Sequence, residues 1–220
     1  MNMKKPRARR ASGRQKVIAY HAGRRQLSDA ALDRLLHLSW RKAEASLDLL
    51  DLLDRYGNEL FEYHGLGYAD IRWIIHALRL TARDVVYDLG AGYGRFVIYG
   101  ALVSPAKFKG IEIVRERAVH IGRAQARLRL RNACVVAQNA AAADFADGTK
   151  FYLFSPFFTP TLRAVARKLE ACAARRPITV VAIYHAAVFF SRQRWLKKVT
   201  AALAKHSDDV PTGLEVFVSR

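Results

Sequence analysis

Residues 85–96 read VVYDLGAGYGRF, and this stretch determines the fold that the sequence predicts. A β-branched, apolar run ends in an acid, a loop with three alternating glycines follows, and a helical pattern begins after it. This order predicts a strand, a tight turn and a helix N-terminus, which together hold a nucleotide-like cofactor at the carboxyl edge of a parallel sheet. Glycines allow φ > 0 and let a ligand approach main-chain N–H groups that no Cβ shields. The stretch therefore predicts a cofactor-binding loop.

Strand and helix patterns alternate along the rest of the chain, which predicts an α/β protein with a doubly wound, parallel sheet. Further strands are expected at 108–113, 133–139, 150–155, 178–184 and 214–218, and helices at 95–103, 115–131 and from 159 onward. The stretch 195–203 fits either a helix or an edge strand.

The chain divides into three parts by its pattern. Residues 1–27 are expected to form a basic, disordered tail, and residues 28–57 a helical extension that Gly57 ends. The extension is longer than most globular helices, so we expect a break near 37–39. Residues 58–220 are expected to form the main domain, in which a glycine-broken loop carrying Tyr63 and Tyr68 precedes the first strand.

The net charge of +18 is unevenly distributed, since residues 1–27 hold nine lysines and arginines and no acid. Such charge favours encounter with polyanions, so RNA, the ribosome, DNA or an acidic protein surface is the expected class of partner. The alternative is a solvated tail that only adds solubility. The composition leaves both interpretations open and does not predict an oligomeric state.

Length and cysteine content argue against a second catalytic domain, a membrane-spanning helix, a disulfide and a zinc site. The 220 residues suffice for one α/β domain with an extension. The longest apolar stretch, 178–190, is about thirteen residues, shorter than the roughly twenty that span a bilayer. Cys134 and Cys172 have no metal-ligand spacing, so no metal is expected, and a reducing, cytoplasmic location is the default.

The glycine loop also limits the choice of cofactor. A dinucleotide-binding loop reads G-x-G-x-x-G, but position 95 is arginine, and the Gly-Lys-Ser/Thr of a phosphate-binding Walker loop is missing. Asp88, directly before the glycines, would repel a phosphate. Its charge suits a cationic ligand.

The stretch from Asp88 to Gly94 resembles the first motif of the class I S-adenosylmethionine-dependent methyltransferases, an acid followed by G-x-G-x-G. The resemblance implies a seven-stranded, Rossmann-like methyltransferase sheet and S-adenosyl-L-methionine as cofactor. It implies that Glu112, at the end of the second strand, binds the ribose hydroxyls, and that Asn139 accepts the adenine amine, with Phe145 packing on the adenine. The cofactor-binding residues implied in this way are Asp88, Gly90, Ala91, Gly92, Gly94, Glu112 and Asn139.

The acceptor is expected to bind after the fourth strand, at Ser155-Pro156-Phe157-Phe158. Enzymes that methylate exocyclic amines of nucleic acids usually have Asp or Asn before Pro-Pro-Tyr or Phe here, which counts against base methylation. The segment, with the loop before Tyr68, is similar to two groups of protein lysine methyltransferases, the disruptor-of-telomeric-silencing-like and the mitochondrial ATP-synthase-c-subunit enzymes. Ser155, Phe157 and Tyr68 are therefore the expected catalytic residues, with Phe158 as a further wall of an aromatic channel.

Two alternatives remain open. The basic charge also fits an RNA or ribosome methyltransferase, or a non-catalytic nucleic-acid-binding protein on the same fold.

His185 follows the fifth strand and is a candidate general base. No acid stands beside it in the sequence, which favours a structural or solvent-facing histidine.

Overall fold

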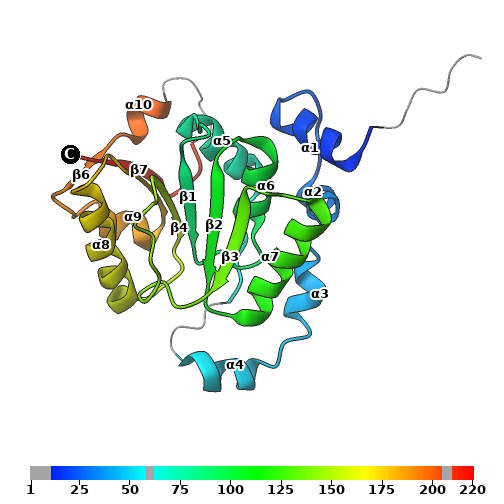
Figure 1. The fold of residues 1–220 in the computed structure, drawn as a ribbon, viewed down its shortest axis with the longest axis horizontal. Helices are drawn as coiled ribbons and strands as arrows, with labels where there is room; N and C mark the ends of the chain where they lie inside the picture. Colours follow the sequence, from blue (N-terminus) through cyan, green and yellow to red (C-terminus); the bar gives the residue numbers. More distant parts are fainter. Residues whose placement is uncertain (1–10, 58–61, 205–209) are drawn as a thin grey trace, which may run out of the picture.

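A central sheet lies between two layers of helices in the computed structural model, which describes residues 11–57, 62–204 and 210–220 (Figure 1). The strand order is β3-β2-β1-β4-β5-β7-β6. Strands β1 to β5 are parallel, whereas β7 is antiparallel to both β5 and β6. The strands are β1 Val85–Leu89, β2 Lys107–Glu112, β3 Ala133–Ala137, β4 Lys150–Phe154, β5 Thr179–Ile183, β6 Leu196–Lys198 and β7 Leu214–Ser219.

Alternate side chains of each inner strand enter two separate cores. Val86 and Phe108 face one core, shared with the helices of the N-terminal half, whereas Tyr87 and Ile111 face the other, shared with α8 and α9. The period-2 alternation of a strand places successive side chains on opposite faces, so a sheet covered on both sides has apolar residues throughout. The helices are α1 Gly13–His21, α2 Asp29–Leu35, α3 Trp40–Glu44, α4 Leu49–Tyr56, α5 Tyr68–Leu78, α6 Arg95–Val103, α7 Arg115–Leu128, α8 Thr159–Ala173, α9 His185–Phe190 and α10 Thr200–Ala204.

The predicted α/β, doubly wound sheet with an N-terminal helical extension is confirmed, with one refinement. The sequence predicts a parallel sheet throughout, but β7 runs antiparallel to both of its neighbours, β5 and β6. The ambiguous stretch 195–203 contains both expected structures, because the short edge strand β6 is followed at once by α10.

The helical extension has two breaks rather than one. The expected break falls at His37, which has a left-handed φ of 59° between α2 and α3. A second interruption at 45–48 separates α3 from α4, and Asp48 starts α4 by accepting hydrogen bonds from the N–H groups of Leu50 and Asp51. Gly57 ends α4 as expected.

Residues 11–27 differ from the expected disordered tail, since α1 occupies 13–21. Ser12 and Gln15 form a reciprocal capping box, in which each side chain accepts a hydrogen bond from the other residue's N–H. Val17 and Tyr20 are buried against the core. The first ten residues of the expected tail lie outside the described part of the chain.

The apolar stretch 178–190 is a strand and a helix, not one long strand. β5 ends at Ile183, Tyr184 has a left-handed φ of 56°, and α9 begins at His185. Among the described residues, no helix has the length and apolar character needed to cross a membrane.

Candidate functional site

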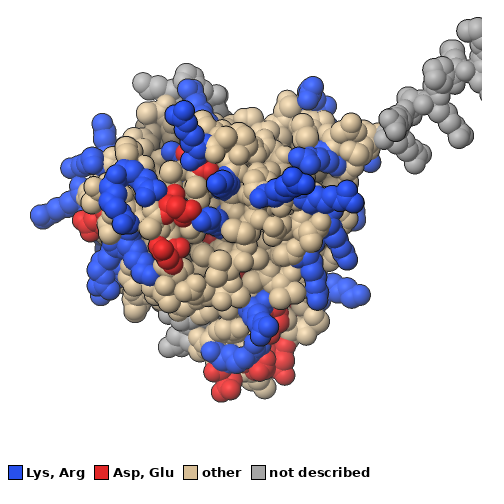
Figure 2. Space-filling model, in the orientation of Figure 1, with Lys and Arg blue, Asp and Glu red and all other residues tan. Residues whose placement is uncertain are grey.

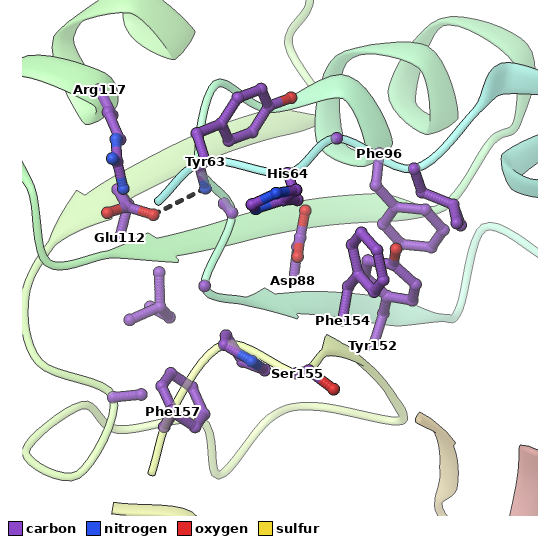
Figure 3. A pocket seen from close by; sticks show the side chains of 18 of the residues that line it. Tyr63, His64, Asp88, Phe96, Glu112, Arg117, Tyr152, Phe154, Ser155 and Phe157 are labelled. Atoms are coloured by element: carbon purple, nitrogen blue, oxygen red, sulfur yellow. Dashed lines mark hydrogen bonds between the residues drawn. The ribbon is translucent and has the colours of Figure 1, made fainter. Parts of the chain in front are cut away.

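A cavity of about 500 Å³ lies at the carboxyl ends of β1, β2, β4 and β5. The glycine loop, the segment after β4 and the 62–66 segment before α5 enclose it (Figure 3). This is the edge at which open α/β sheets bind their ligands. Most of the residues expected to bind the cofactor line it, namely Asp88, Gly90, Ala91, Gly92, Glu112 and Asn139, together with the expected acceptor residues Ser155 and Phe157.

Two glycines of the loop are required by close approaches. Gly90 has φ 88°, and a Cβ there would lie 2.1 Å from Cβ of Pro156 in the segment after β4. Gly92 has φ 54°, and a Cβ there would lie 2.4 Å from the ring of Tyr63. The glycine loop therefore packs directly against both the segment after β4 and the segment before α5, and any larger side chain in the loop would displace them.

Glu112 lies at the end of β2 with only 4% of its surface exposed. Its two carboxylate oxygens accept hydrogen bonds from the N–H groups of Gly92 (2.7 Å) and Val114 (2.9 Å), the first of which Figure 3 shows as a dashed line. Burial raises the pKa of Glu112, while both N–H donors and the Arg117 charge oppose that shift. A carboxylate has about four acceptor positions, so lone pairs remain for hydroxyl donors from a ligand.

Asp88 is the second buried acid of the cavity. In the described part of the chain no hydrogen bond or ion pair engages its carboxylate. Burial, reinforced by the nearby charge of Glu112, raises the pKa of Asp88 well above its usual value. A cationic group beside Asp88 would oppose both effects and favour the carboxylate.

Arg95 lines the cavity but already has a carboxylate partner. Its Nε and Nη2 donate to Asp33 Oδ1 (2.9 Å) and Oδ2 (2.6 Å), and both side chains are 7% exposed. Trp40 Nε1 also donates to Asp33 (3.0 Å). Tyr68, one of the expected catalytic residues, belongs to this cluster: it is fully buried, its hydroxyl donates to Asp33 (2.8 Å), and it does not line the cavity.

Arg117 is held in the same way by the helical extension. Its Nη2 and Nε donate to the two oxygens of Glu44, at 2.5 Å and 3.1 Å, and the hydroxyl of Tyr93 donates to Glu44 at 2.7 Å. Both arginines that line the cavity are thus paired with acids from α2 and α3. The helical extension forms part of the wall of the site.

Ser155 and Phe157, in the segment after β4, also line the cavity. Ser155 has a left-handed φ of 45°, and its hydroxyl donates to the carbonyl oxygen of Ile183 (2.6 Å), which ties the segment after β4 to the end of β5. His185 Nε2 lies 2.8 Å from the Phe157 carbonyl oxygen, so the ring supports this segment. That contact accounts for His185 structurally. Phe158 is half exposed and lies outside the lining.

Two further expected contacts fall elsewhere. Phe145 is 1% exposed within the core beneath α8 and does not line the cavity. Gly94 also lies outside the lining and caps α6 with φ 80°. Asn139 lines the cavity, and its side-chain oxygen accepts the N–H of Ala141 (2.8 Å), which leaves one lone pair for a ligand.

Sequence reasoning missed the aromatic side of the cavity. Tyr152 is the sheet partner of Asp88 in the β1–β4 register and stacks on Phe96 with ring centroids 4.1 Å apart. Phe154 follows two residues later on the same face, and Figure 3 shows its ring beside that of Tyr152. The ring of Phe154 also lies 5.7 Å from that of Tyr184. The signal was present in the alternation of aromatic residues along β4, which places Tyr152 and Phe154 on one face of the strand.

No family model matches the sequence, and no curated protein matches it. Several solved structures are similar to the fold of this chain. An RNA methyltransferase from Salinibacter ruber in complex with S-adenosyl-L-homocysteine is 19% identical with a TM-score of 0.50, covering 71% of this chain and 92% of that one. An rRNA methylase from Streptococcus thermophilus is 11% identical (TM-score 0.43; 72% and 97% covered).

The YcgJ protein from Bacillus subtilis is 16% identical with a TM-score of 0.44, and the match covers 53% of this chain and 51% of that one. The chain thus spans about half the length of YcgJ. Together with the strand order and the position of the glycine loop, the Salinibacter match shows the fold of the class I S-adenosylmethionine-dependent methyltransferases.

Proposed function

We propose that the protein is an S-adenosylmethionine-dependent methyltransferase. The observation that carries this proposal is the pair of buried acids, Asp88 and Glu112, that line one cavity beside a glycine loop. A ligand with a ribose and a cationic amino-acid group would offer hydroxyl donors to Glu112 and a positive charge to Asp88. Glu112 would accept hydrogen bonds from the ribose hydroxyls, each worth roughly 1.5 to 3 kcal/mol because the acceptor is charged.

The charges of the cavity favour this ligand over a nucleotide phosphate. Arg95 and Arg117 line the cavity, but Asp33 and Glu44 already neutralise them. Asp88 has no such partner among the described residues. A phosphate would meet an uncompensated acid, whereas the ammonium and sulfonium of S-adenosylmethionine would be attracted to it.

The protein's own role in such a reaction is alignment and exclusion of water. Bound S-adenosylmethionine supplies an activated methyl group on its sulfonium. The residues around it have to hold the acceptor in line with that group and keep the cavity dry, which the packing of Pro156 on Gly90 and of Tyr63 on Gly92 supports.

For the acceptor we propose a lysine amine of a protein as first candidate. Phe154, Phe157 and Tyr184 border the cavity on the acceptor side, and Ser155 lies between them. Lysine must lose a proton before attack, which costs about 4.6 kcal/mol at pH 7 from a pKa near 10.4. Apolar aromatic surroundings lower that cost by removing water from the ammonium, which favours the neutral amine. The Ser155 carbonyl could orient the amine.

RNA is the second candidate acceptor. The specific observation in its favour is an exposed, flat ring at the cavity, Tyr184, which is 52% exposed and could stack on an unpaired base. The Salinibacter protein with the same fold is described as an RNA methyltransferase.

Calorimetry with S-adenosylmethionine tests the cofactor. We expect saturable binding to the wild-type protein and none to Gly92→Arg, because any side chain at 92 meets the Tyr63 ring. Gly122→Ala is the matched control, since a Cβ at 122 meets nothing within 4 Å and binding should be unchanged. Absence of binding to the wild-type protein would contradict the proposal.

A labelling experiment tests the acceptor. Lysate incubated with the protein and methyl-tritiated cofactor is digested with protease or with nuclease. Label released only by protease supports a protein acceptor, and label released only by nuclease overturns the lysine candidate. Tyr184→Ala should lower turnover with cofactor affinity intact, while Val188→Ala, equally exposed on α9, should leave both unchanged.

A further inference from the structure

A second cleft lies at the opposite edge of the sheet from the cofactor cavity. It measures about 440 Å³ and is formed by α1, the start of β2 and the α7–β3 connection. Four of its eight lining residues are cationic and none is acidic. The cations are Arg14, Lys107, Arg129 and Arg131.

The floor of the cleft is rigidly built. Asn132 donates from its side-chain nitrogen to the carbonyl oxygens of Ala101 and Ala106, both at 2.9 Å, and its own carbonyl oxygen accepts the N–H of Phe108. Leu130 beside it is 5% exposed. Arg129 and Arg131 flank Leu130, and Arg131 directly precedes Asn132, so the backbone positions of both arginines are fixed while their side chains are exposed.

The cations of the cleft are uncompensated. Within the described residues, none of the four forms an ion pair. Asp84 precedes β1 beside Lys107, but its carboxylate accepts hydrogen bonds from Thr81 and Thr149 and lies 3.7 Å from Lys150. Holding four like charges near one another without counterions costs electrostatic energy, which an anionic partner would recover.

The cationic surface continues beyond the cleft. Arg123 and Arg127 are exposed on α7, one turn apart, or about 6 Å along the helix axis. Figure 2 shows Lys and Arg over the side of the molecule that carries α7, as well as over the opposite side that carries α8, while acids lie at the bottom over α4 and to the left of centre. The cations therefore form a track longer than a single small anion.

We propose that this surface, the cleft of Arg14, Lys107, Arg129 and Arg131 with its α7 continuation, binds the phosphodiester backbone of a nucleic acid. Guanidinium groups bind phosphate oxygens in pairs, and regularly spaced phosphates match a track of cations better than one isolated phosphate does.

The surface docks the partner and does not hold the reacting group. The five steps of β2 from Lys107 to Glu112 separate it from the cofactor cavity by about 17 Å. The inference is independent of the proposed methyl transfer, because it requires only a polyanion partner.

The test compares two charge-reversed variants by fluorescence anisotropy with a short, labelled, single-stranded RNA of mixed sequence. Lys107→Glu/Arg131→Glu reverses two cleft residues, and Arg167→Glu/Arg175→Glu reverses two exposed arginines of the α8 region. Each pair lowers the net charge by four from +18. We expect at least about tenfold weaker binding for the cleft variant and a salt slope smaller by about 1.4, or 0.7 per lost phosphate contact.

Equal weakening by the two variants would overturn the proposal, because it would show that net charge alone determines binding. A labelled poly-glutamate peptide or phosphatidylglycerol vesicles that bound more tightly than RNA, with the same dependence on Lys107 and Arg131, would also overturn it. Lys107→Gln/Arg131→Gln repeats the test without charge reversal. S-adenosylmethionine affinity should be unchanged in both cleft variants, which separates this result from the test of methyl transfer.

Discussion

Asp33→Asn should destabilise the protein strongly, because it removes the charge that faces Arg95. Both side chains are 7% exposed, and Arg95 donates to both oxygens of Asp33. Removing one partner of such a buried pair costs about 3 to 5 kcal/mol, since the other charge remains buried without compensation. The asparagine oxygen and Asp29, 3.5 Å from Arg95, retain part of the interaction, so we expect about 3 kcal/mol.

Thermal unfolding measures the effect. A loss of 3 kcal/mol lowers the melting temperature of a protein of this size by about 6 to 12 °C. Asp51→Asn is the matched control, because Asp51 pairs with Arg55 on the surface of α4, where solvent screens the pair, and its loss should barely change the melting temperature. If the melting temperatures of the two variants differed by less than about 2 °C, the buried pair of Asp33 and Arg95 would not stabilise the protein more than the surface pair does.

Three further predictions concern charge in and around the site. Glu112→Gln should weaken S-adenosylmethionine binding roughly 10- to 100-fold, because the amide places an N–H₂ group against one of two backbone donors, whereas Glu116→Gln should not. Cofactor binding should lower the raised pKa of Asp88, so binding should release protons and the affinity should weaken as pH falls. Calorimetry in two buffers of different ionisation enthalpy measures the number of protons released. A result of zero protons would contradict the prediction. Burial, followed by the charge of His76, lowers the pKa of His21 to about 4, so the unfolded chain binds more protons between about pH 6.5 and 4. Stability should therefore fall as pH drops through that window, and less so in His21→Gln, as measured by melting temperature.

The part of the cavity around the glycine loop could be predicted from the sequence because its signals are local. The acid, the three glycines and Glu112 occupy fixed places at strand ends, so residue types at short spacing are enough to locate them. Asp88, Gly90, Gly92 and Glu112 line the cavity, whereas Gly94 does not, because parallel strands present their carboxyl ends, and the residues that directly follow them, at one edge of the sheet.

The surroundings of the site could not be predicted, because they depend on contacts between distant residues. Nothing in the sequence near Tyr68 indicates that its hydroxyl is used by Asp33, thirty-five residues earlier. The same holds for Arg95 and Arg117, which in sequence resemble free cations. The capping box of Ser12 and Gln15, by contrast, was readable, but the basic residues around it concealed a helix that buries only Val17 and Tyr20.

The two arginine pairs also constrain the order in which the chain can fold. Asp33 is 62 residues before Arg95, and Glu44 is 73 residues before Arg117. At a synthesis rate of 5 to 20 residues per second, Asp33 waits about 3 to 12 s before its partner has been made. Asp33 in α2 and Glu44 in α3 therefore gain their arginine partners only after β1 and the glycine loop have been made, and these helices close over a site that is made later.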